Sequence, residues 1–68
     1  MKDYKIRFVE NLKLFMKDKN VNQTDLANAI GVHQTTVSAW LLGQNEPPFS
    51  KVCLIVDFFG CDFKDFTE

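Results

Sequence analysis

Two short helical patterns separated by a single glycine most constrain how this 68-residue chain can fold. Apolar residues recur at the spacing of one helical face up to Ile30, and Gly31 then interrupts the pattern. The same spacing resumes with Val37 and Trp40. A glycine can take the positive φ that a tight turn between two crossed helices requires. Residues 23–42 therefore predict a helix-turn-helix.

Further helical patterns flank this pair, and no strand pattern occurs. Asn22 is a good N-cap residue with Asp25 three residues later, and Gly60 is a typical helix stop. Two prolines at 47 and 48 forbid helix between the third and fourth segments. The expected helices span residues 3–18, 23–30, 34–42 and 49–59, followed by a short helix that begins at Asp62 and docks Phe63 or Phe66. We expect an all-α fold of five helices in a single domain, 1–68.

Size and composition limit the other possibilities. A chain this short buries only about 60% of its unfolded surface, which is enough for one small core. Cys53 and Cys61 lie among apolar residues and are expected to be small buried side chains in a reducing cytoplasm. A zinc site would need two more ligands, which His33 alone cannot supply, so we expect no metal. No apolar stretch reaches membrane length, so we expect no membrane partner.

Catalysis is not expected from these residues. The chain has one histidine, no plausible pair of nucleophile and base, and no glycine-rich loop that could cradle a phosphate. We therefore predict that the protein is not an enzyme, has no catalytic residue and uses no cofactor.

Residues spread over most of the chain keep the spacing of a known family. They are Leu12, Phe15, Asn22, Gln23, Leu26, Ala27, Ile30, Gly31, Val32, Val37, Ser38, Trp40, Gly43, Pro47, Val52, Ile55, Phe59, Gly60 and Phe66. On these residues the sequence resembles the Cro and phage-repressor (lambda-repressor-like) helix-turn-helix family. The resemblance implies a compact five-helix domain that binds double-stranded DNA as a transcriptional regulator.

The resemblance also implies which residues contact DNA. In the family the third helix lies in the major groove, and its first residues reach base edges. Gln34 matches the first base-reading position, where its amide can pair with adenine N6 and N7. Thr35, Ser38 and Ala39 match further reading positions. The alternative interpretation of these residues is a solvated polar helix face.

Phosphate contacts are implied at the ends of the neighbouring helices, where unpaired backbone N–H groups favour an anion. The candidates are Asn22, Gln23, Thr36, Gly43, Gln44 and Lys51. For Gln44 and Lys51 a plain solvated surface is an equal alternative. His33 is expected at the N-cap of the third helix, as a cap or an exposed side chain.

The charge distribution argues against strong DNA binding. No Lys or Arg occurs between residues 20 and 50, and the formal net charge is −1. Two functions therefore stay open. The first is a sequence-specific regulator that binds a palindromic operator as a homodimer, at least on DNA. The second is a protein-interaction module, such as an antirepressor or an antitoxin-like partner, that keeps the fold without strong DNA binding.

Self-association is suggested by the fourth helical segment. Leu54 and Phe58 are one turn apart and fall off the buried stripe of that helix. With Phe63 or Phe66 they would form an apolar patch of the kind that marks an interface. The alternative is that Phe58 completes the core under the last helix.

The clearest departure from the family concerns an ion pair. Many members carry an Arg in the first helix and a Glu after the Trp-like position of the third, and these two positions hold Met16 and Leu41 here. Replacing both charges of a partly buried pair by apolar side chains is often neutral or stabilising. We therefore predict that Met16 and Leu41 lie in contact, within about 4.5 Å.

Overall fold

The computed structural model describes residues 4–67, and the side chains of residues 7–66. The described chain forms five helices and no strand: α1 Tyr4–Lys19, α2 Gln23–Ile30, α3 Gln34–Leu41, α4 Phe49–Phe59 and α5 Lys64–Thr67. The all-α prediction and the order of the helices are confirmed. The predicted start of the first helix at Asp3 lies outside the described residues, and α1 ends one residue later than predicted. Leu42 follows α3 as its C-cap instead of belonging to it.

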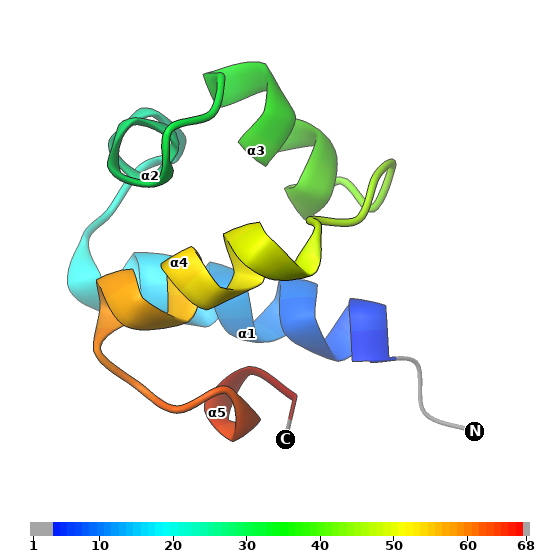
Figure 1. Ribbon diagram of the computed structural model, residues 1–68, viewed down its shortest axis with the longest axis vertical. Coiled ribbons are helices and arrows are strands. Elements are labelled where there is room, and N and C mark those ends of the chain that lie inside the picture. Colours follow the sequence, from blue (N-terminus) through cyan, green and yellow to red (C-terminus); the bar gives the residue numbers. More distant parts are fainter. Residues whose placement is uncertain (1–3, 68) are drawn as a thin grey trace.

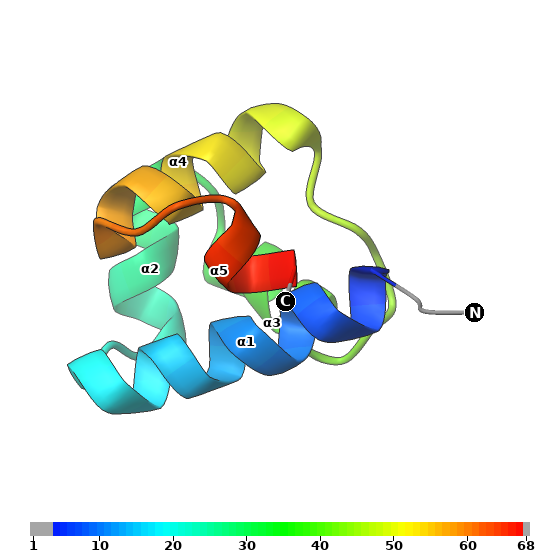
Figure 2. The same cartoon turned by 90° about the horizontal axis from the view of Figure 1, so that it is seen from below.

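The helix-turn-helix and the last helix lie on opposite sides of the molecule. Figure 1 shows α2 and α3 crossing at the top, α1 and α4 beneath them, and α5 at the bottom. In the view from below, α5 lies in front of α1 and α4, and α3 lies behind them (Figure 2). The helix expected to read DNA is therefore far from the C-terminal helix.

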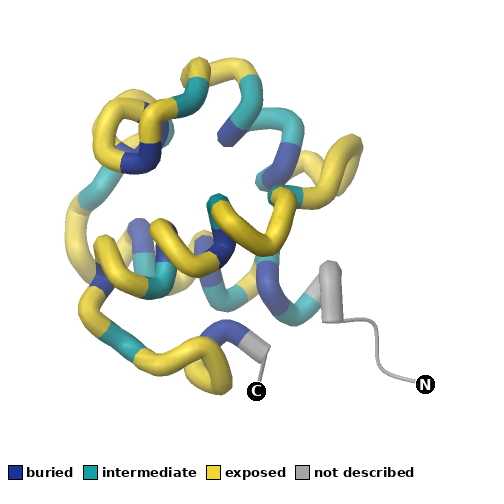
Figure 3. The backbone as a smooth tube through the Cα atoms, in the orientation of Figure 1, coloured by how far each residue is buried: buried dark blue, intermediate teal, exposed yellow. Residues whose placement is uncertain are grey.

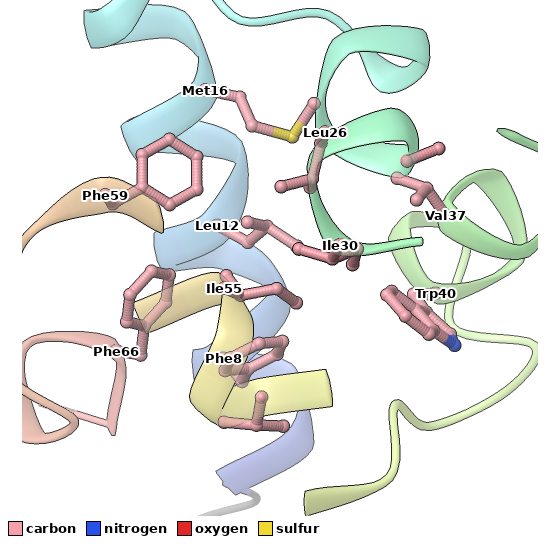
Figure 4. Packing of buried hydrophobic residues seen from close by; sticks show 12 residues of the cluster. Phe8, Leu12, Met16, Leu26, Ile30, Val37, Trp40, Ile55, Phe59 and Phe66 are labelled. Carbon is pink, nitrogen blue, oxygen red and sulfur yellow. The ribbon is translucent and has the colours of Figure 1, made fainter. Parts of the chain in front are cut away.

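All four long helices contribute to one apolar core. Leu12, Ile30 and Ile55 meet near its centre (Figure 4). The buried side chains are Phe8, Leu12, Met16, Leu26, Ala27, Ile30, Val37, Trp40, Val52, Ile55, Phe59 and Phe66. Buried positions recur on the inward sides of the helices (Figure 3), as the sequence periodicity predicted. Each fully buried large aliphatic or aromatic side chain contributes about 1.5–3 kcal/mol to the hydrophobic free energy of folding.

An aromatic cluster fixes the last helix. The Phe66 ring centroid lies 4.7 Å from that of Phe15 and 5.2 Å from that of Phe8, and Phe66 has no exposed surface. Phe63 is 48% exposed, so of the two residues considered from the sequence, Phe66 is the one that docks. α5 begins at Lys64, two residues after the predicted start at Asp62, and the Asp62 backbone N–H bonds to the Asp65 carboxylate three residues later at 2.9 Å.

A side chain of α1 also holds α5. The Asn11 amide donates a hydrogen bond of 2.6 Å to the backbone carbonyl of Phe66, 55 residues away in the chain. A helix leaves its last carbonyls without partners, and a side-chain donor can satisfy one of them. Asn11 therefore joins the two ends of the described chain.

The helices end in one repeated type of turn. After α2, Gly31 has φ 74° and the Val32 N–H bonds to the Ala27 carbonyl at 3.0 Å. After α1 the left-handed residue is Asn20, with φ 57°, and the next N–H bonds back to the Met16 carbonyl. These bonds satisfy carbonyls that the helix leaves open and turn the chain sharply. The turn at Gly31 sets the crossing of α2 and α3.

Candidate DNA-binding surface

The start of α2 is closed by a reciprocal cap. The Asn22 side-chain oxygen accepts a hydrogen bond of 2.7 Å from the Asp25 N–H, and the Asn22 N–H donates to the Asp25 carboxylate at 3.4 Å. This is the capping arrangement that the spacing of the two residues predicted. The cap does not use the N–H groups of Gln23 and Thr24. These groups lie in the first turn of α2, where the end of a helix favours an anion.

The recognition face of α3, defined here as Gln34, Thr35, Ser38 and Ala39, lies opposite its buried side. Gln34 and Thr35 are exposed, whereas Ser38 and Ala39 are half-buried. Thr36 is also half-buried, and Val37 and Trp40 anchor the other side of the helix in the core. All four side chains of the recognition face thus keep some exposed surface.

A hydrogen bond couples the two helices at this face. The Gln34 Nε2 donates to the Gln23 Oε1 at 2.8 Å. The other Nε2 hydrogen and the Oε1 atom of Gln34 stay available, which are the two groups that pair with adenine N7 and N6. The sequence suggested separate roles for the two glutamines, and their hydrogen bond became visible only once the helices were placed together.

His33 occupies the N-cap position of α3 without capping it through its side chain. The ring is exposed, and its Nδ1 lies 3.2 Å from the Thr35 hydroxyl in a hydrogen bond. The expectation of an exposed side chain is confirmed, whereas a side-chain cap is not formed. The contact places an imidazole next to one member of the recognition face.

Three phosphate candidates are already engaged within the protein. The Gly43 N–H donates to the Trp40 carbonyl at 3.1 Å, and the Gln44 N–H to the Ala39 carbonyl at 2.9 Å. The turn after α3 thus uses the Gly43 N–H, and the expected phosphate contact of this group stays a prediction. The Lys51 Nζ donates to the last carbonyl of α2, that of Ile30, at 3.1 Å. An ammonium group there stabilises the negative end of the helix dipole.

A helix-turn-helix family model of the Cro/C1, or lambda-repressor-like, type matches residues 12–66. The chain belongs to this family. It is a DNA-binding regulator of helix-turn-helix type, and the match spans α2, α3 and the turn between them. No curated protein and no solved structure matches the chain. None of the described helices is long and apolar enough to cross a membrane.

A second surface of this helix-turn-helix protein is apolar. Leu54, Phe58 and Phe63 are 44%, 42% and 48% exposed, as expected for a surface patch, and Phe49 is exposed to 71%. The buried Phe66 has no surface to offer, so its expected place in the patch is wrong. The sequence analysis missed Phe49, which lies in the first turn of α4 with its ring 6.1 Å from that of Phe63. Phe49, Leu54 and Phe63 line one hollow, and we call them the apolar patch, whereas Phe58 is exposed on α4 without lining that hollow.

The two cysteines of this regulator differ in their surroundings. Both are free thiols, and Cys53 is exposed, which contradicts the prediction that it is buried. Burial, together with the carboxylates of Asp65 and Asp62, raises the pKa of the half-buried Cys61 thiol. Among the described residues, no group of three or more His, Cys, Asp or Glu side chains could hold a metal ion.

Proposed function

We propose that this regulator binds one specific double-stranded DNA sequence, as phage repressors and Cro proteins do, with α3 in the major groove. The observation that carries the proposal is the exposed Gln34 amide at the start of α3, oriented by its hydrogen bond to Gln23. Such an amide has the donor and acceptor pattern that selects adenine. Thr35 and Ser38 would read neighbouring base edges through their hydroxyls, and Ala39 would offer an apolar contact.

The positioning contacts would come from the start of α2. The first-turn N–H groups near Gln23 and the Asn22 amide, whose hydrogens bond to none of the described residues, would bind a phosphate of the DNA backbone. Thr36 and Gln44 are exposed enough to contribute hydroxyl and amide donors, and Lys51 keeps two ammonium hydrogens beyond its bond to α2. These contacts would hold the register of α3 without selecting bases.

We also propose that two copies associate through the apolar patch on a palindromic operator. The strongly exposed Phe49 borders a hollow of about 740 Å³ on the same face, which is lined by Phe49, Cys53, Leu54, Val56, Asp57, Gly60, Cys61 and Phe63. An exposed ring next to a hollow on one surface suits a two-fold contact. In such a contact the Phe49 ring of each copy would occupy the hollow of the other copy. Two-fold symmetry would also place two α3 helices on half-sites about 34 Å apart.

The dimer is tested by sedimentation equilibrium of the wild type and of two matched variants. Leu54→Asn lies in the apolar patch, whereas Leu14→Asn removes a leucine of α1 that is even more exposed, 64% against 44% for Leu54. We expect the Leu54 variant to shift the monomer–dimer equilibrium toward monomer and the Leu14 variant to behave as the wild type. A wild type that stays monomeric at high micromolar concentration, with and without DNA, would refute the dimer.

Sequence specificity is tested by selecting duplexes from a random pool on the purified protein. We expect an enriched palindrome, and binding that weakens as salt rises, because phosphate contacts release counterions. A pool that shows no enrichment, together with no salt-dependent binding to any duplex, would refute the function.

That negative result would favour a second candidate, a protein-interaction module. It is supported by the absence of Lys and Arg between residues 20 and 50 and by the exposed apolar patch. In either case we propose a reducing cytoplasm as the location, which suits the free thiols of Cys53 and Cys61.

A further inference from the structure

We infer that Lys13 of α1 contacts the DNA backbone and is the cation that holds the α2–α3 pair on its site. The inference rests on the proposed DNA binding. It follows from where the fold places Lys13, outside the segment of the chain that forms the helix-turn-helix.

Lys13 lies beside the start of α2 and beside the turn that follows α3. It lines one hollow together with Met16, Leu41 and the first residues of α2, Gln23 and Thr24, as well as their cap, Asn22. It also lines the neighbouring hollow, which includes Leu42, Gly43 and Asn45 of the turn after α3. In Figure 1, α1 can be followed beneath α2 and α3. A DNA strand that contacts the start of α2 would therefore pass within reach of the Lys13 side chain.

The ammonium group of Lys13 is available for a ligand. It is exposed, and with the described residues it forms no hydrogen bond or ion pair. The hollow at the start of α2 has no acidic residue in its lining, whereas Glu10 and Glu46 line the second hollow. Lys51 donates to the Ile30 carbonyl at the other end of α2, whereas Lys13 lies beside the first turn of α2 and bonds to no acceptor among the described residues.

A phosphate at the start of α2 would thus meet two complementary groups. The first-turn N–H groups supply directed hydrogen bonds, and Lys13 supplies a full charge with three rotatable donors. Each phosphate neutralised by a lysine on duplex DNA adds about 0.9 to the slope of log affinity against log salt. Lys13 would contribute this term equally on specific and random duplexes, because a phosphate contact carries no sequence information.

Lys17 provides a matched control on the same helix. It is exposed like Lys13 but lines a hollow with Asn11, Leu14 and Asp65, on the side of α1 that faces α5. The experiment measures duplex affinity at several salt concentrations for the wild type, Lys13→Gln and Lys17→Gln. Thermal unfolding of each variant checks that the fold is kept, and Lys13→Arg tests rescue by another cation.

We expect Lys13→Gln to lower the slope by about 0.9, while Lys17→Gln leaves it unchanged and Lys13→Arg restores it. Between 0.05 M and 0.2 M salt the wild type would then lose about 3.5-fold more affinity than Lys13→Gln. Equal slopes for Lys13→Gln and Lys17→Gln, with salt-dependent binding by the wild type, would overturn this inference alone. A wild type without salt-dependent binding would overturn the proposed function and this inference with it.

Discussion

The hydrogen bond between Gln34 and Gln23 predicts that the two residues do not act independently on DNA. The amide of Gln34 has two hydrogens, of which one bonds to Gln23 at 2.8 Å. The other hydrogen and the oxygen of this exposed amide bond to none of the described residues and can pair with a base. From the sequence alone, Gln23→Ala should weaken all duplexes alike, because Gln23 matches a phosphate position. The structure changes this prediction: without Gln23 the reading amide loses its orientation, so specificity falls as well.

The size of the effect follows from the groups removed. Gln34→Ala deletes a bidentate base contact, worth about 1–3 kcal/mol of discrimination against the wrong base pair, or roughly 5–150-fold. Gln23→Ala leaves that contact possible but removes a hydrogen bond that contributes about 0.5–1.5 kcal/mol. In the double variant, removing Gln23 has no further effect on specificity, because the Gln34 amide that it orients is already absent. We therefore expect a coupling of about 0.5–1.5 kcal/mol between the two substitutions.

A double-mutant cycle on two duplexes measures this coupling. One duplex carries the selected site, and the other has the base pair opposite Gln34 replaced. Asn28→Ala is the control, since it removes an exposed amide side chain of α2 that has no side-chain hydrogen bond to the described residues. The reasoning is refuted if Gln23→Ala lowers affinity for both duplexes by the same factor and the coupling stays below about 0.3 kcal/mol.

Three further predictions concern the fold and the thiols. Asn11→Ala should cost about 1 kcal/mol and lower the melting temperature by about 4–8 °C, because the Phe66 carbonyl of α5 loses its donor; an unchanged melting curve would contradict this. Iodoacetamide at pH 8 should alkylate the exposed Cys53 before Cys61, because the raised pKa of Cys61 keeps its thiol protonated to higher pH. Equal alkylation rates of the two thiols, measured by mass spectrometry, would contradict this difference in reactivity. Met16 and Leu41 line one hollow beside the core, which suits the predicted contact between them. Met16→Ala and Leu41→Ala should then be non-additive in urea unfolding, and strict additivity would contradict the predicted contact.

The core could be predicted from the sequence because its signal is local. Apolar spacing along each helix identified Leu12, Leu26 and Ile55, which have no exposed surface. The ends of α2 could also be predicted. The Asn22 side chain suits an N-cap, and Gly31, which has no side chain, suits a left-handed turn. The short last helix was less certain, because two aspartates three residues apart resemble a cap whether or not a helical turn follows.

The candidate site was harder to predict, because its key contacts join different helices. Neither the Gln34–Gln23 bond nor the Lys51–Ile30 bond has a pattern along the chain, and both depend on how α2 crosses α3 and α4. The Gly43 N–H was predicted to be available for a phosphate because its own local turn was not considered. A glycine suggests an open backbone, whereas the turn it permits uses its own N–H to close the helix.

The charge argument shows how folding changes what a sequence count means. Counting Lys and Arg between residues 20 and 50 gives none and predicts weak binding, yet α1 places Lys13 beside the start of α2. Extending the count by one residue would add Lys51, whose ammonium already donates to the last carbonyl of α2. With so few cations per copy, the salt dependence of one copy should be shallow. Useful affinity for an operator would then require two copies bound together, and the proposed association through the apolar patch would contribute directly to DNA binding.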